Sequence, residues 1–308
     1  MLRFIFRRIF FEAIPTLLVL VTVTFFLIRL APGGPFSSEM NVPPEVKAAI
    51  EAKYRMDQSL PMQYLSYLGD LAQGDLGPSF KYKDFTVNEL VNKAVPVSFK
   101  LGIVAFIIAL IFGVGAGVAA ALKQNTWIDY SVMGVAMIGV VLPNFVLAPM
   151  LALVFAVWLK ILPAGGWEGG QFTFMVLPVA VLCKHYISVI ARITRGSMIE
   201  VLGSAFIRTA RAKGLPMHYI LRRHALKPAL LPVVSYLGPA FVGIITGSVV
   251  VETFFGIPGI GQLFINGALN RDYSMVLGLT ILIGTLMITF NAIVDILYGF
   301  IDPRIRIK

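Results

Sequence analysis

The chain has 308 residues, of which 57% are hydrophobic and 14% are charged, and its mean hydropathy is +0.83. Soluble domains carry roughly 25% charged residues, so this composition excludes an ordinary cytosolic enzyme, and the high hydrophobicity excludes a disordered chain. The net charge of +10 does not require a nucleic-acid partner, because the cytoplasmic loops of membrane proteins collect Lys and Arg, and we predict an all-α polytopic membrane protein.

The first apolar run covers residues 9–28 and follows three arginines, Arg3, Arg7 and Arg8. A cleaved signal peptide has a shorter apolar region of roughly 7–15 residues. The sequence therefore predicts a retained transmembrane helix, and the arginines place its N-terminus in the cytoplasm.

The next segment, residues 31–96, is predicted to form a small extracytoplasmic helical lobe. Proline at the first turn favours a helix over residues 43–56, and glycines indicate a turn over residues 74–78. The residues 86–89 read as a capping box, which opens a short amphipathic helix that we expect to end before Pro96.

Five further apolar runs predict spans at residues 97–122, 130–159, 174–193, 229–251 and 275–300. Six spans place both termini in the cytoplasm. Proline and glycine inside spans two to five predict bent helices, and small residues four apart, such as Gly113 and Gly117, allow close helix packing.

The charges support this orientation. The predicted inner segments hold 15 of the 26 basic residues, with three acidic residues nearby. The predicted outer lobe holds six basic and eight acidic residues. This is the distribution that the positive-inside rule requires.

The sequence contains no catalytic motif that we can identify. No Gly-Lys pair occurs, so a phosphate-binding Walker A loop is absent, as is a GxSxG nucleophile motif. The three histidines and the single cysteine, Cys183, are too few to predict a zinc site. We therefore expect no catalytic residue, no metal site and no bound cofactor, and an energy source in a partner or an ion gradient.

Ion coupling requires carboxylates inside the spans, and Glu12, Glu252 and Asp295 lie near span ends. Lys184 lies halfway along the fourth predicted span. It either snorkels or caps a carbonyl near the Pro178 kink, or it faces a water-filled cavity or a second subunit. Both interpretations stay open, since no acid of this chain lies at the same predicted depth.

The longest inner loop, residues 192–228, is the most informative segment. Apolar residues at helical spacing over residues 198–206 predict one helix, Gly214 and Pro216 interrupt it, and a second helix is predicted over residues 217–226. Two short helices form a compact projection from the membrane. The alternative is a basic amphipathic segment that lies on anionic lipid, although a Gly-Pro corner is poorly suited to that.

Two stretches of this loop resemble the EAA loop of binding-protein-dependent ABC importer permeases: residues 208–216 (Arg-Thr-Ala-Arg-Ala-Lys-Gly-Leu-Pro) and residues 224–232 (His-Ala-Leu-Lys-Pro-Ala-Leu-Leu-Pro). The chain also resembles the peptide-type branch, which includes oligopeptide, dipeptide and nickel permeases, at residues 192–198 and 251–263. The motifs at residues 29–33 and 74–77 fit the B-type subunit of that branch. The resemblance covers essentially the whole chain.

The loop departs from the general Glu-Ala-Ala pattern at its first two positions, which are Arg208 and Thr209. Ala210 and Gly214 match the pattern, and the later proline, Pro228, lies one position late. The peptide branch tolerates these departures.

The resemblance implies the ABC type-1 importer permease fold, in which this loop docks in a groove of a cytoplasmic ATPase. The contact residues it implies are Arg208, Thr209, Ala210, Arg211, Lys213, Gly214, Leu215, Pro216, Leu226 and Pro228. Lys184 and Asn291 are candidates for the translocation path. The implied domains are an N-terminal helix (1–30), the outer lobe (31–96) and the permease domain (94–300) with its coupling loop (192–228).

The implied function is the passage subunit of an oligopeptide importer in the bacterial cytoplasmic membrane, with no nucleic-acid partner. Its implied partners are lipid, a second homologous permease, two ATPases that bind ATP and magnesium, and an extracytoplasmic peptide-binding protein that docks on the outer face. The alternatives are a permease for dipeptides, nickel or another small solute, and, in a different class, a scaffold or receptor without flux.

Overall fold

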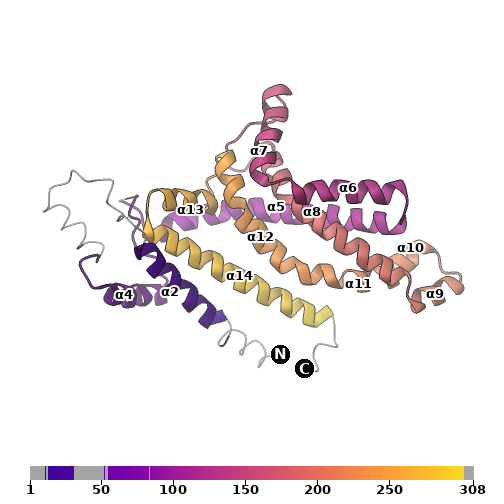
Figure 1. Cartoon of the computed structure of the whole chain (residues 1–308), viewed down its shortest axis with the longest axis horizontal. Coiled ribbons are helices and arrows are strands. Elements are labelled where there is room, and N and C mark those ends of the chain that lie inside the picture. The colour runs from indigo at the N-terminus through magenta and orange to yellow at the C-terminus, as the bar shows by residue number, and fades with distance from the viewer. Residues whose placement is uncertain (1–10, 12, 31–51, 53–54, 83, 302–308) are drawn as a thin grey trace. The chain divides into compact units, whose positions relative to one another are not determined.

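The computed structural model of the chain describes residues 11, 13–30, 52, 55–82 and 84–301 (Figure 1). In chain order its helices are α2 (Ile14–Leu30), α4 (Leu60–Ala72), α5 (Val87–Leu122), α6 (Trp127–Val141), α7 (Asn144–Ala152), the π-helical η2 (Leu153–Trp158), α8 (Phe172–Leu202), α9 (Ala205–Ala212), α10 (Met217–Ile220), the π-helical η3 (Leu221–Ala225), α11 (Leu226–Ala229), α12 (Leu231–Phe255), α13 (Ile260–Leu269) and α14 (Tyr273–Ile301). The only strand-like pairing within the described residues is an isolated bridge between Pro78 and Thr86. The all-helical class predicted from composition is confirmed.

Four of these helices, α5, α8, α12 and α14, are long and apolar enough to cross a membrane. The pair formed by α6 and α7 with η2 passes the same test when it is counted as one span, which gives five. The first predicted span corresponds to α2, which has 17 residues and is apolar but shorter. The predicted helix over residues 43–56 lies almost entirely outside the described residues.

Contacts between residues divide the chain into two compact units. The first consists of residues 1–97 and 258–288, and the second of residues 98–257 and 289–308. Two of the three boundaries fall inside helices, α5 and α14, so each of these helices contributes to both units, and the third falls between α12 and α13. The domain limits predicted above rest on membrane topology and stay a prediction.

In the first unit, α2 packs against α4 through aromatic rings. The ring of Phe25 lies 5.3 Å from that of Tyr64 in an edge arrangement, and Arg29 donates from Nε to Oε1 of Gln63 at 2.8 Å. Burial raises the pKa of the Tyr67 phenol on α4, and the nearby Arg29 guanidinium opposes this shift. An aromatic contact and a side-chain hydrogen bond thus hold α4 against α2.

The predicted capping box is confirmed at the start of α5. The backbone N–H of Glu89 donates to Oγ1 of Thr86 at 3.2 Å, and the backbone N–H of Thr86 donates to the Glu89 carboxylate at 3.1 Å. The predicted helix end before Pro96 is wrong, since α5 continues through this proline to Leu122. Proline removes one backbone donor, but the 36-residue apolar helix is continuous on both sides of it.

In the second unit, α8 packs against α6 and α12, and α9 and α10 lie at the C-terminal end of α8, away from α7 (Figure 1). Helix α5 also approaches α8 closely. A Cβ on Gly113 would lie 2.8 Å from Ile190, and one on Gly117 would lie 2.5 Å from Cβ of Thr194. The packing role predicted for these two glycines is therefore confirmed.

The third predicted span, residues 130–159, is not one straight helix. It breaks after Leu142, and the two halves are bent by 104°. Pro143 causes the break, because it cannot donate a hydrogen bond to the carbonyl of Gly139 one turn earlier. By contrast, Pro149, Pro178 and Pro239 lie inside continuous helices.

Candidate functional site

The loop after α8 consists of two helical segments separated by a sharp corner. The first predicted helix is interrupted, because α8 ends at Leu202 and α9 begins only at Ala205. At the corner Gly214 has φ +75°, its N–H donates to the carbonyl of Arg211, and the N–H of Leu215 donates to the carbonyl of Ala210. These bonds form a Schellman motif, for which glycine is the preferred residue.

The second helical segment begins after Pro216 as predicted. It runs through α10, η3 and α11 to Ala229, three residues beyond the predicted end at residue 226. Pro216 supplies the fixed φ that starts this segment, and the carbonyl of Pro216 accepts the N–H groups of Tyr219 and Ile220.

The loop has its own apolar core. Its buried members are Ala121 of α5, Met198 of α8 and, from the loop, Ile207, Ala210, Ile220, Ala225 and Ala229. Leu215 and Leu226 are partly buried and pack against this cluster. Three of the predicted contact residues, Ala210, Leu215 and Leu226, therefore stabilise the loop and leave little surface for a partner.

The other predicted contact residues divide differently. Arg208, Thr209, Arg211, Lys213, Gly214 and Pro216 are exposed, and Pro228 is half-buried. The loop also exposes three large side chains that the sequence did not single out as contacts: Phe206, Met217 and Tyr219 are 50%, 42% and 45% exposed. An apolar side chain that faces solvent on a short helix is the signal that identifies them, and only the structure shows which face is turned outward.

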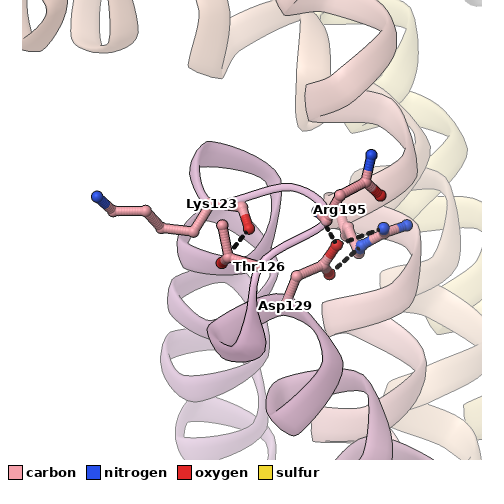
Figure 2. A network of polar contacts seen from close by, with 5 residues as sticks. Lys123, Thr126, Asp129 and Arg195 are labelled. Atoms are coloured by element: carbon pink, nitrogen blue, oxygen red, sulfur yellow. Dashed lines mark hydrogen bonds and ion pairs between the residues drawn. The ribbon is translucent and has the colours of Figure 1, made fainter.

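A two-point ion pair joins α8 to the first turn of α6 (Figure 2). Arg195 donates from Nε to Oδ1 of Asp129 at 2.5 Å and from Nη2 to Oδ2 at 2.7 Å. Oδ2 of Asp129 also accepts the backbone N–H of Asn125, and Oγ1 of Thr126 donates to the carbonyl of Lys123 at 2.6 Å (Figure 2). The turn is thus fixed to α8 seven residues before that helix ends.

Lys184 on α8 lies at the break between α6 and α7. Its ammonium donates to the carbonyl of Gly139 at 3.1 Å and to the carbonyl of Leu142. The Gly139 carbonyl is the one to which Pro143, having no backbone N–H, cannot donate a hydrogen bond. Lys184 therefore caps a kink, as one interpretation predicted, but the kink is at Pro143 and not at Pro178, which lies inside α8.

Two cavities are lined by Lys184. One, of about 510 Å³, lies among α5, α6 and α8 and has mainly apolar walls. The other, of about 210 Å³, lies at the break itself. Asn291, the other predicted path residue, lines neither of them; it is half-buried on α14, near Gly238 of α12.

A buried carboxylate, Glu252, joins α12 to α5. It is fully buried and accepts hydrogen bonds from Oγ of Ser98 and Oγ of Ser248, each at 2.7 Å. Within the described part of the chain, no group of three His, Cys, Asp or Glu side chains is arranged to hold a metal ion.

Comparison with protein families shows which family the chain belongs to. Residues 113–307 match the binding-protein-dependent transport system inner membrane components, and residues 1–101 match the N-terminal region of the corresponding membrane components. The chain belongs to this family. As an inner membrane component, it carries the loop after α8, Lys184 and Glu252 within the matched region.

Close relatives of this inner membrane component are similar over their whole length. The oligopeptide transport system permease protein OppB of Salmonella typhimurium is 67% identical over 306 residues, which cover 99% of this chain and 100% of that protein. The OppB of Escherichia coli K12 is 66% identical with the same coverage. The dipeptide transport system permease protein DppB of Bacillus subtilis is 42% identical and covers 100% of this chain and 99% of its own length.

Solved structures confirm the fold that the resemblance implied. The MetNI methionine ABC transporter in an inward-facing conformation matches with a TM-score of 0.54 at 18% identity, over 67% of this chain and 95% of that chain. An amino acid ABC transporter with histidines matches with a TM-score of 0.55 at 15% identity, over 69% of this chain and 94% of that chain. The inner membrane component therefore has the ABC type-1 importer permease fold.

Proposed function

We propose that this chain is the passage subunit of an ATP-driven importer that takes up oligopeptides from an extracytoplasmic binding protein. The observation that carries the substrate class is the identity of 66–67% over 306 residues to permeases named for oligopeptide transport. Such similarity over the full length supports a shared passage as well as a shared fold.

The proposed topology has six spans, with both termini in the cytoplasm, the outer lobe at residues 31–96 and the permease domain at residues 94–300. The helices α5, α8, α12 and α14, with the bent α6–α7 pair counted as one span, supply up to five spans, and we assign the sixth to the apolar but shorter α2. The charge distribution supports the orientation, since the loop after α8 is rich in Arg and Lys.

The proposed assembly contains a second homologous permease, two cytoplasmic ATPases and the binding protein in a bacterial cytoplasmic membrane. This chain would bind neither ATP nor magnesium, because it has no phosphate-binding loop. Its contact with an ATPase would be the exposed face of the loop, which presents Phe206, Met217 and Tyr219 among exposed arginines. Aromatic residues and arginine are the residue types enriched at protein interfaces.

A permease for dipeptides is the second candidate, and the similarity to a dipeptide permease at 42% identity favours it. This identity is lower than that to the oligopeptide permeases. The two candidates differ in the length of the peptide that passes, so they are separable by transport measurements.

The test is reconstitution of the complete complex in proteoliposomes with its binding protein. We expect ATP-dependent uptake of labelled pentapeptides that exceeds uptake of dipeptides and of nickel. Uptake is also measured without ATP, because a channel would carry the peptide in that case too. Uptake of dipeptides alone would favour the second candidate, and a complex that lacks ATPases and carries no solute would contradict the transport function.

A further inference from the structure

The cavity at the break between α6 and α7 has an unusual lining for a site between apolar helices. Four of its nine lining residues are polar, namely Asn144, Lys184, His185 and Tyr186. They come from the start of α7 and from three successive positions of α8. The cavity therefore brings the Lys184 ammonium and other hydrogen-bonding groups to one place.

The ammonium of Lys184 has one more N–H donor than it has hydrogen-bond acceptors among the described residues. An ammonium group has three N–H donors, and two of them go to the carbonyls of Gly139 and Leu142. In the part of the chain that the structure describes, no carboxylate forms an ion pair with it: Asp129 pairs with Arg195, and Glu252 accepts from Ser98 and Ser248. A lysine inside a membrane helix is costly without a partner, so a positive charge with a remaining donor is available to a ligand.

We propose that this cavity is a subsite for a carboxylate of the transported substrate, in which Lys184 binds the C-terminal carboxylate of a peptide. The inference rests on the proposed function. The C-terminal carboxylate is the one anionic group that every unmodified oligopeptide carries, whatever its sequence. A passage that recognises it therefore tolerates different side chains.

The dimensions fit the end of a peptide. A volume of about 210 Å³ is smaller than the roughly 300–1,000 Å³ of pockets that enclose a whole small-molecule ligand. The adjoining cavity of about 510 Å³ shares Leu142 and Lys184 with it but has no second charged group in its lining. The carboxylate would thus lie at the polar end, with less polar parts of the peptide beside it.

The first experiment compares one labelled pentapeptide as its free acid and as its C-terminal amide, in ATP-dependent uptake by the complete complex in proteoliposomes. The variants are Lys184→Gln, which keeps N–H donors without the charge, and Lys184→Arg, which keeps the charge. Lys100→Gln is the matched control, because the Lys100 ammonium also donates to a backbone carbonyl, that of Gly170 at 2.9 Å, and lines neither cavity.

A hydrogen bond to a charged group is worth roughly ten- to a hundredfold in affinity. We expect the acid-to-amide uptake ratio to fall about tenfold in Lys184→Gln and to stay near wild type in Lys184→Arg and Lys100→Gln. Because all variants receive cargo from the same binding protein, its own preference cancels in the comparison. An unchanged ratio in Lys184→Gln would overturn the subsite and leave Lys184 with its capping role alone.

A second measurement does not depend on whether the binding protein carries the amide. Carbodiimide coupling of an isotopically labelled peptide to the complex joins a carboxylate to a neighbouring amine, and mass spectrometry identifies the modified lysine. We expect the free acid to modify Lys184 and not Lys100, and the amide to modify neither. An unmodified Lys184 in a complex that transports would overturn the proposal, as would release of the second permease from Lys184→Gln, which would place the counter-charge there. By contrast, a wild-type complex that takes up neither peptide would contradict the proposed function itself.

Discussion

Arg195 on α8 forms a two-point ion pair with the carboxylate of Asp129 on α6, although the two residues are 66 positions apart. The side chain of Asp129 is 1% exposed and that of Arg195 is 28% exposed. The pair fixes the turn between α5 and α6 to the helix that leads directly into the exposed loop. A movement of the loop that shifts the end of α8 therefore has to carry this turn with it.

Loss of the pair should destabilise the protein in a graded order. Arg195→Ala leaves an enclosed carboxylate with a single backbone donor, so we expect the largest loss of thermal stability. Arg195→Lys keeps the charge but not the two-point geometry, and should be intermediate. The double variant Asp129→Ala/Arg195→Ala should be more stable than Arg195→Ala, because it leaves no unpaired charge. Melting temperatures of the purified protein in detergent test this order; a wild-type melting temperature in all three variants would show that the pair contributes nothing.

Gly139 and Gly134 on α6 provide a matched pair of glycines. A Cβ on Gly139 would clash with Oγ of Ser188 and lie 2.9 Å from the carbonyl oxygen of Lys184, whereas a Cβ on Gly134 would meet nothing within 4 Å. Gly139→Ala should destabilise the protein by about 1–3 kcal/mol, the usual cost of overpacking. Gly134→Ala should be neutral or stabilising by up to about 1 kcal/mol, because alanine favours the helix. A chemical denaturation series on both variants decides this; equal effects would mean that α6 and α8 do not pack at Gly139.

The sequence predicted the helices better than it predicted their breaks. The runs of apolar residues and the capping box at Thr86 depend on neighbours along the chain, so the sequence alone was enough to predict them. The effect of a proline depends on partners elsewhere. Pro96 lies inside a helix, whereas Pro143 follows the end of one. The carbonyls of Gly139 and Leu142 at that break accept hydrogen bonds from Lys184, more than 40 positions away.

The candidate site was predictable to a similar extent. The corner at Gly214 followed from local glycine and proline preferences. The division of the loop into a buried face, with Ala210 and Leu226, and an exposed face, with Phe206, depends on contacts of the loop with α5 and α8. The pairing of Asp129 with Arg195 has no local signature, because each charge alone also fits a solvated loop.

The six-span topology makes a prediction for reporter fusions. A fluorescent protein fused after Lys308 should fluoresce, and alkaline phosphatase at the same position should be inactive, because the C-terminus is expected in the cytoplasm. Alkaline phosphatase inserted at the exposed turn of Gly74 should be active. An active phosphatase after Lys308 would contradict six spans, since an odd number of crossings would then separate the two termini.

Gly214 provides the sharpest test of the loop. Its φ of +75° is costly for a residue with a side chain, yet a Cβ there would meet nothing within 4 Å. The cost is therefore backbone strain alone, about 1–2 kcal/mol. That is too little to unfold a helical membrane protein, and Gly214→Val should reach the membrane in normal amounts.

The strain is expected to change the angle at which α10 leaves the corner and thereby the exposed face of Arg208, Phe206 and Tyr219. We predict that Gly214→Val abolishes or severely weakens peptide uptake and releases the ATPases from the purified complex, while the affinity of the binding protein for peptide is unchanged. Gly214→Asn should be milder, because asparagine tolerates positive φ. Gly203→Ala is the control, since Gly203 lies in the same loop with an ordinary φ of −82°. Uptake and ATPase retention at wild-type levels in Gly214→Val would show that this glycine only terminates a helix and that the ATPase contact lies elsewhere.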